Sequence, residues 1–229
     1  MPDQETDISR VARSRRETQA AYDRLSRWYD LVSGEAEWTH VHRALDRLAV
    51  EPGESVLEIG CGTGRALVAL AQAVGSAGDV HGLDLSPGML LRARARIGDA
   101  NTSARVLLTC GDAACLPYAA ASFDAIFMSF TLELFDTPEI PIVLGECRRV
   151  LRPGGRMGVV SLSRASGLTL LARLYEWGHR HFPALLDCRL IYAERSLSAS
   201  GFATSSAERT SMWGLPIEVV VARRLGPGD

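Results

Sequence analysis

The chain has 229 residues, of which 47% are hydrophobic, and a formal net charge of −2 at pH 7. This length suits one large domain, or a domain with a small appendage, built on a substantial core. Because the chain lacks the basic excess of nucleic-acid-binding proteins, we expect no nucleic-acid partner. No apolar run approaches the roughly 20 residues that span a bilayer, and the first residues lack a secretory signal pattern, so we expect a cytoplasmic protein.

Apolar spacing in the first 50 residues predicts two helices, at about 14–30 and 37–48. We expect residues 1–50 to form a helical cover over a functional site and residues 51–229 to form the domain that carries this site. Strands and helices alternate in this second part, which predicts an α/β fold with a mostly parallel sheet covered on both faces. The expected strands lie near 56–59, 80–84, 106–108, 123–129, 157–161, 201–205 and 217–222, and the last is antiparallel.

The helices between these strands carry recognisable start and stop signals. Ser86 is a plausible N-cap with Pro87 at the first helical position of a helix that runs to about residue 97. The helix at 140–151 stops at an Arg-Pro-Gly-Gly run, and a further helix is expected at 192–200.

The first expected strand ends in a glycine-rich turn. Glu58 lies in the strand, and Gly60, Gly62 and Gly64 follow at alternate positions before a helix begins at Arg65. Glycine allows backbone angles that a β-carbon penalises and lets a ligand approach the main chain. The helix N-terminus beyond the turn offers free N–H groups and the positive end of a dipole. The stretch therefore predicts a site for a small cofactor.

The spacing of the glycines indicates which cofactor. A dinucleotide fingerprint places its third glycine three residues after the second, whereas Gly64 follows Gly62 by two. The second strand ends in Asp84, whose carboxylate could accept both hydroxyls of a ribose. This combination resembles the class I S-adenosylmethionine (SAM)-dependent methyltransferases and disfavours NAD.

Further sequence blocks follow in order: Gly111–Ala113, Leu116–Tyr118, Ser122–Asp124, Ser129–Phe130 and Arg149–Arg156. With these blocks the chain resembles the C-methyltransferases of ubiquinone and menaquinone biosynthesis (methyltransferase type 11), over about residues 21–163. The resemblance implies a Rossmann-like, doubly wound, seven-stranded sheet and SAM as the cofactor. The cofactor-binding residues that it implies are Tyr29, Glu58, Gly60, Gly62, Thr63, Gly64, Asp84, Leu85, Met89, Asp112, Ala113, Ser129 and Phe130.

Within that set, the resemblance assigns Thr63 to the methionine part of SAM and Asp84 to the ribose. It assigns the carboxylate of Asp112 to the exocyclic amine of adenine. It places Ser129 below the sulfonium centre, and Tyr29 in a cover over the cofactor. Methyl transfer from a sulfonium needs mainly orientation and exclusion of water, so few catalytic groups are expected.

Glu133 marks a departure from the quinone enzymes, which carry an arginine in their substrate cavity at this point of the pattern. A carboxylate there would suit an amine substrate or act as a base; alternatively, Glu133 is a glutamate that faces solvent. The candidate catalytic residues are Glu133 and Tyr29, the residue that the resemblance places in the cover over the cofactor. No metal site is expected, because the pairs His40/His42 and His179/His181 lack acidic or thiol partners at ligand spacing.

The C-terminal part should shape the substrate site, with residues 164–192 as the main segment. Its amphipathic stretch 168–182 is either an interfacial segment that touches membrane lipid or a helix that packs on the core. The connection 209–216 is expected at the cofactor edge. There Trp213 either walls the substrate pocket, together with Tyr22 and Glu133, or packs as an ordinary aromatic residue.

The leading hypothesis is a SAM-dependent methyltransferase that acts on a small, partly hydrophobic molecule, such as a quinone precursor or a natural product. One alternative is a phosphatidylethanolamine-type phospholipid N-methyltransferase. An alternative of another class is a non-catalytic SAM-binding regulatory protein. The sequence leaves open the methyl acceptor, whether carbon, nitrogen or oxygen is methylated, the general base and the oligomeric state.

Overall fold

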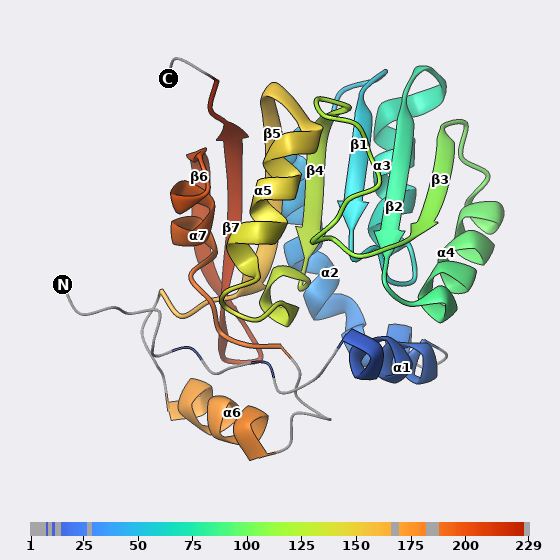
Figure 1. Ribbon diagram of the computed structural model, residues 1–229. Helices are drawn as coiled ribbons and strands as arrows, with labels where there is room; N and C mark the ends of the chain where they lie inside the picture. Colours follow the sequence, from blue (N-terminus) through green and yellow to red (C-terminus); the bar gives the residue numbers. More distant parts are fainter. Residues whose placement is uncertain are drawn as a thin grey trace.

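A seven-stranded sheet forms the centre of the computed structural model, in the order β3-β2-β1-β4-β5-β7-β6 (Figure 1). The structure describes residues 8, 11, 15–26, 29–165, 170–181 and 188–226; the side chains of residues 25 and 29–33 are not included in this description. The strands are β1 (Ser55–Ile59), β2 (Asp79–Asp84), β3 (Arg105–Cys110), β4 (Phe123–Ser129), β5 (Leu151–Leu162), β6 (Phe202–Met212) and β7 (Leu215–Arg224).

Strands β1 to β5 pair in parallel, and β7 pairs antiparallel with both β5 and β6. The α/β fold class, the mostly parallel sheet and the antiparallel C-terminal strand are thus confirmed. The strand order reverses between β1 and β4, because the chain first builds the sheet outward to β3 and then returns. Ligands of such sheets bind at this point, outside the carboxyl ends of the strands.

Two hydrophobic cores cover the two faces of the sheet. Helices α5 (Ile140–Val150) and α7 (Ala193–Ala199) pack on one face, and α2 (Tyr29–Leu48), α3 (Arg65–Val74) and α4 (Pro87–Ala100) pack on the other. Val41, Ala44 and Leu48 of α2 are buried in the second core. The C-terminal half of α2 therefore belongs to the core. The predicted division of the chain into a helical cover (residues 1–50) and a site-bearing domain (residues 51–229) stays a prediction.

Local sequence signals explain several element boundaries. The hydroxyl of Ser86 accepts a hydrogen bond from the N–H of Met89, and Pro87 opens α4, which confirms the predicted cap. The first predicted helix is wrong in extent: α1 spans Arg15–Leu25, and α2 begins separately at Tyr29. Gly34, with φ of 64°, is non-helical and divides α2 at a kink, so the part of α2 after the kink begins close to the predicted residue 37.

The prediction of residues 209–216 as a connecting loop was wrong. Residues 209–212 continue β6 and pair with β7, and only Trp213 and Gly214 form the turn. Both turn residues have positive φ, 52° and 78°, as a tight two-residue hairpin requires. β6 is an edge strand that is mostly exposed, so it lacks the apolar run that marks the buried strands.

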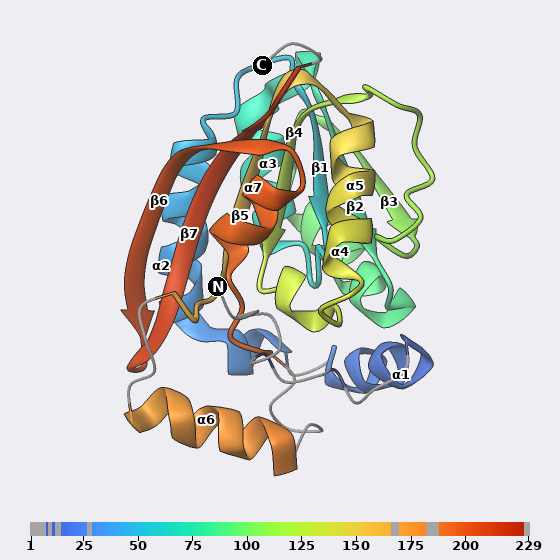
Figure 2. The same cartoon turned by 60° about the vertical axis from the view of Figure 1, so that its left-hand side comes forward.

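Helices α1 and α6 (Leu170–His181) lie beyond the carboxyl ends of the parallel strands (Figures 1 and 2).

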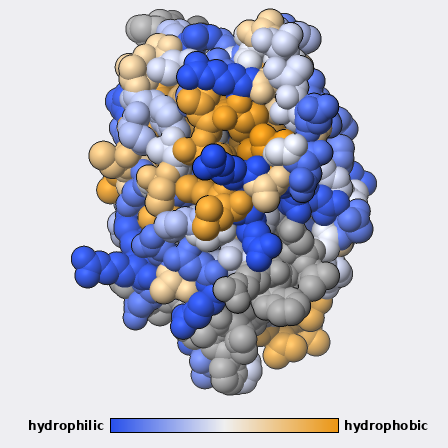
Figure 3. Space-filling view, turned by 90° about the vertical axis from the view of Figure 1, so that its right-hand side faces the viewer, coloured by the Kyte–Doolittle hydropathy of each residue, from blue (hydrophilic) through white to orange (hydrophobic). Residues whose placement is uncertain are grey.

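Strand β3 forms the sheet edge opposite β6, and its residues are exposed or half-buried. Hydrophobic residues gather at the centre of the face that includes this edge, with hydrophilic ones around them (Figure 3). Within the described residues, no helix is both long and apolar enough to cross a membrane.

Candidate cofactor and active site

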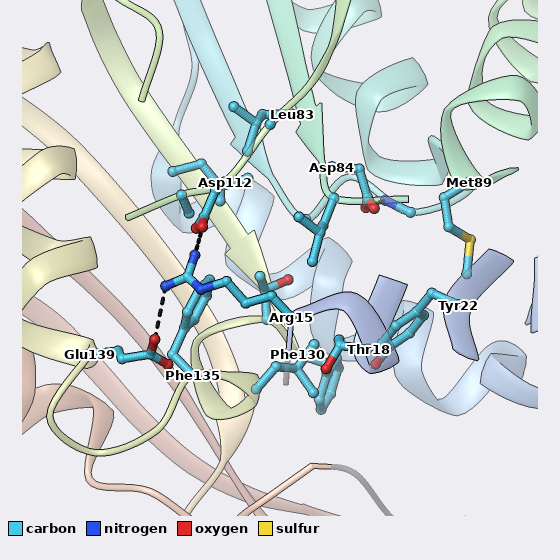
Figure 4. Close-up of a pocket in the computed structure, with 18 of the residues that line it drawn as sticks. Arg15, Thr18, Tyr22, Leu83, Asp84, Met89, Asp112, Phe130, Phe135 and Glu139 are labelled. Atoms are coloured by element: carbon cyan, nitrogen blue, oxygen red, sulfur yellow. Dashed lines mark hydrogen bonds and ion pairs between the residues drawn. The ribbon is translucent and has the colours of Figure 1, made fainter. Parts of the chain in front are cut away.

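Two adjoining pockets open at the carboxyl ends of β1, β2 and β4. The larger, about 900 Å³ including its open mouth, lies between the strand ends and α1; we call it the apolar pocket (Figure 4). The smaller, about 480 Å³, lies between the glycine turn and α2; we call it the polar pocket. Gly60, Gly62 and Ser129 line both pockets, so the two meet at the glycine turn.

The pockets bring together most of the residues that the sequence assigned to a cofactor. The apolar pocket is lined by Tyr22, Gly60, Gly62, Asp84, Leu85, Met89, Asp112, Ala113, Ser129 and Phe130, among others. The polar pocket adds Glu58 and Thr63. Gly64 lines neither pocket and forms the N-cap of α3.

The glycine turn is held in a conformation that only glycine adopts easily. Gly60, Gly62 and Gly64 have φ of 69°, 51° and 81°. A β-carbon on Gly60 would lie 2.3 Å from the hydroxyl oxygen of Thr131, and one on Gly64 would lie 2.9 Å from the backbone of Ala93. Conformation and close packing both require glycine at these two positions.

Asp84 ends β2 and ties the glycine turn to the start of α4. One carboxylate oxygen accepts the N–H of Gly62 at 2.8 Å, and the other accepts the N–H of Ser86 at 2.8 Å. Burial raises the pKa of this carboxyl, and the hydrogen bonds from Ser86 and Gly62 oppose that rise. The carboxylate also lines the apolar pocket (Figure 4). It can therefore accept hydrogen bonds from a ligand while it holds the turn.

Glu58 presents an unsatisfied acceptor to the polar pocket. Its side chain is buried, and its Oε2 atom has no hydrogen-bond partner in the protein. Burial, with the nearby Asp84, raises the pKa of Glu58 well above its usual range. A buried carboxylate oxygen without a donor is costly. An ammonium group bound in the polar pocket would supply both the donor and the opposite charge.

Arg15 of α1 crosses the apolar pocket and joins two acids. Its guanidinium forms an ion pair with Asp112 and another, at 2.9 Å, with Glu139 (Figure 4). Asp112 also accepts the N–H of Ala114 at 2.9 Å. Arg15 is not among the predicted site residues, because an arginine in a basic run gives no local signal of a distant acidic partner.

The other end of α1 is fixed by Asp23. Its Oδ1 atom accepts the N–H of Gly88 at 2.9 Å and the hydroxyl of Ser86, both at the start of α4. Arg15 and Asp23 thus tether α1 over the pocket, where Thr18 and Tyr22 face the cavity (Figure 4). Asp23 and Thr18 were also missed, since neither belongs to a recognisable motif.

Two predicted residues lie outside both pockets. Glu133 is fully buried in a short 3-10 helix (Leu132–Leu134) and lines neither pocket; it does not face solvent. Its Oε1 atom accepts the N–H of Leu162 at 3.2 Å. Trp213 is 62% exposed at the β6–β7 turn and lines neither pocket. Tyr29 is the first residue of α2, and its side chain is outside the description.

The comparisons with known proteins agree with this geometry. Residues 56–155 match the family model described as a methyltransferase domain. The chain is 39% identical to the demethylmenaquinone methyltransferase of Lactobacillus johnsonii over 118 residues. These residues are 52% of this chain and 48% of that protein. It is 32% identical over 177 residues to the demethylmenaquinone methyltransferase of Staphylococcus aureus strain MRSA252, 76% of this chain and 69% of that one.

The chain belongs to the SAM-dependent methyltransferases. It spans about half the length of the Lactobacillus relative. The fold is also that of the N-methyltransferase NodS from Bradyrhizobium japonicum, solved with S-adenosylhomocysteine (SAH). The TM-score is 0.69 at 18% identity, over 90% of this chain and 98% of that one.

The residues of this methyltransferase fit SAM as its cofactor. The unpartnered oxygen of Glu58 in the polar pocket suits the ammonium of the methionine part. Asp84 and Asp112, which follow adjacent strands and line the apolar pocket, suit the ribose and the adenine. Among the described side chains, no group of three or more His, Cys, Asp and Glu residues is arranged to hold a metal ion.

Proposed function

We propose that the protein transfers a methyl group from SAM to a small, partly hydrophobic acceptor of the quinone-precursor type. The observation that carries the proposal is the apolar wall that continues from Ser129 at the strand end. Phe130, Leu134 and Phe135 form this wall, with Tyr22 of α1 on the other side. The relatives named demethylmenaquinone methyltransferase support an acceptor of this chemistry.

When bound, SAM supplies an activated methyl group on a sulfonium. The protein's own part is to bind, orient and exclude water. Phe130 contributes to orientation, because it adopts φ of 47° and donates its N–H to the carbonyl of Val160. A non-glycine residue in this region is strained, and such strain is common where a side chain is fixed for function.

The carboxylates that line the apolar pocket are already engaged. Asp84 accepts two backbone N–H groups, and Asp112 and Glu139 both pair with Arg15. These contacts occupy carboxylate oxygens that a general base would need. An acceptor that reaches the site as a nucleophile therefore suits it better than one that needs a strong base. A reduced quinone, whose ring is electron-rich, meets this condition.

The test is a transfer assay with methyl-labelled SAM and a panel of acceptors. The panel contains a naphthoquinol with a short isoprenoid tail, a catechol, a primary amine and phosphatidylethanolamine vesicles. We expect label in the naphthoquinol, and loss of transfer in Asp84→Ala. Label in phosphatidylethanolamine alone would identify a phospholipid N-methyltransferase. SAH binding without transfer to any acceptor would contradict the proposal and favour a regulatory protein.

A further inference from the structure

Helix α6 turns its apolar side outward. Leu170, Leu174 and Trp177 are 86%, 61% and 52% exposed. Spacings of four and three residues place these side chains on one side of a helix. On the opposite side, Glu176 and His179 are buried. A helix on the surface of a globular protein normally has the reverse arrangement, with apolar residues inside.

A buried ion pair explains why the polar side faces inward. Arg164, just after β5, pairs with Glu176, and both side chains are almost fully buried. Removing one member of such a pair would leave an uncompensated charge, so the pair fixes the rotation of the helix about its axis. The leucines and the tryptophan are consequently held in solvent, at the cost of hydrophobic burial.

The exposed apolar surface continues onto the β6–β7 turn. A β-carbon on Gly214 would lie 2.7 Å from Cδ2 of Leu171, so the turn and the helix are in contact. Trp213, next to Gly214, is 62% exposed. We define the α6–Trp213 patch as Leu170, Leu171, Leu174, Trp177 and Trp213. The elements that carry it, α6 and the β6–β7 turn, lie on the side of the molecule to which the carboxyl ends of the parallel strands point (Figures 1 and 2).

The patch also reaches the edge of the cofactor site. The Trp213 ring comes within 4.0 Å of a β-carbon built on Gly34, and Gly34 lines the polar pocket. The patch therefore adjoins the polar pocket of the cofactor site.

The charges on α6 favour a particular partner. Arg173 and Arg180 are exposed, and Glu176, the acid of this helix, is buried in its ion pair. The outer side of the helix thus combines leucines, a tryptophan and arginines without an exposed carboxylate. This is the composition of helices that lie in the interface of a bilayer with anionic headgroups. A protein partner would need acidic groups around an apolar groove, a more specific arrangement than an anionic bilayer provides.

We propose that the α6–Trp213 patch docks on the surface of an anionic lipid bilayer. Leucine and tryptophan side chains enter the headgroup region, and Arg173 and Arg180 contact lipid phosphates. The docking does not depend on the reaction. Entry of a lipid-soluble acceptor into the site from this side is a separate step, and it rests on the proposed function.

The test is flotation of the full chain with vesicles of phosphatidylcholine, alone or with one third phosphatidylglycerol. The variant Leu174→Asp/Trp177→Asp should lower the partition coefficient at least tenfold. The matched control is Leu91→Asp/Ile142→Asp, since Leu91 and Ile142 are 69% and 54% exposed on other helices. This control should change partitioning less than twofold. Arg173→Ala and Arg180→Ala should each weaken binding to the anionic vesicles by about fivefold.

A second readout needs no disruptive variant. Brominated acyl chains should quench the tryptophan fluorescence of the wild-type protein, and the quenching should largely disappear in Trp177→Phe/Trp213→Phe. Absence of vesicle binding by the wild type at low salt overturns the proposal, as does equal weakening in the matched control. A dimer that Leu174→Asp/Trp177→Asp dissociates, without vesicle binding, would assign the patch to a second copy of the chain.

Transfer to a short-tailed, water-soluble acceptor without lipid separates the two proposals. The Leu174→Asp/Trp177→Asp variant should keep this activity, because the substitutions lie outside both pockets. Vesicle binding by a wild type that methylates no acceptor would leave the docking intact and remove the proposed reaction.

Discussion

Replacing Glu133 with glutamine should stabilise the protein at alkaline pH. The carboxyl is fully buried, accepts the N–H of Leu162 with one oxygen and has no partner for the other. Burial raises the pKa of Glu133 from 4.5 to about 8, although the Leu162 N–H and the charge of Arg189 favour the ionised form. The folded protein therefore keeps a proton on this group at neutral pH.

The expected magnitude follows from the difference between the folded and unfolded pKa. Between pH 4.5 and about 8 the unfolded chain has lost this proton and the folded chain has kept it. Because the folded state binds more protons, stability falls as pH rises through this range. At about 1.4 kcal/mol for each pH unit, the free energy of unfolding falls by about 5 kcal/mol by the time the pH exceeds 8. This is a large share of the total stability of an ordinary domain. Glutamine carries no titrating proton and can still accept the Leu162 N–H.

The assay is urea unfolding of the wild type and Glu133→Gln at pH 5, 7 and 9. The variant should differ little from the wild type at pH 5 and should be several kcal/mol more stable at pH 9. Glu35→Gln is the matched control, because the Glu35 side chain is 86% exposed, and it should follow the wild type. Parallel pH profiles for the wild type and Glu133→Gln would refute the reasoning.

The other predictions concern the cofactor site. Asp84→Ala removes the acceptor of two backbone N–H groups and a pocket carboxylate, so calorimetry should show SAH binding weakened at least tenfold. Gly60→Ala should cost about 2 kcal/mol or more in urea unfolding, because its β-carbon would overlap Thr131; Gly62→Ala meets no atom within 4 Å and should cost only about 1 kcal/mol, from backbone strain. Arg15→Ala should speed amide hydrogen exchange across α1 about tenfold and leave α3 unchanged.

The centre of the fold was predictable because its signals are local. The buried strands are short apolar runs, and the glycines, Asp84 and Asp112 stand at fixed positions after them. A parallel sheet brings the carboxyl ends of its strands to one edge, so the chain order of these residues already implies a shared site. Gly60, Gly62, Asp84 and Asp112 line the pockets, whereas Gly64 caps α3.

The cover over the site was less predictable because it depends on distant partners. The ion pairs of Arg15 with Asp112 and Glu139 join parts of the chain that no local pattern connects. The sequence pattern predicted Glu133 as a substrate-pocket residue, but a short 3-10 helix directs it to the backbone of Leu162. The direction of a side chain in such a turn is set by packing.

Helix α6 illustrates a further limit of periodicity. The spacing of Leu170, Leu174 and Trp177 identifies an apolar side, but it does not say which side faces the protein. The buried pair of Arg164 and Glu176 decides this point. A tertiary contact between two charged residues thus outweighs the usual preference of an amphipathic helix.

The central claim is that the apolar and polar pockets together form one SAM site around the glycine turn. Isothermal titration calorimetry of the full chain with SAH tests it most directly. We expect one site per chain, with SAH binding weakened at least tenfold both by Asp84→Ala in the apolar pocket and by Glu58→Gln in the polar pocket. Absence of SAH binding, or SAH binding that neither substitution changes, would contradict it.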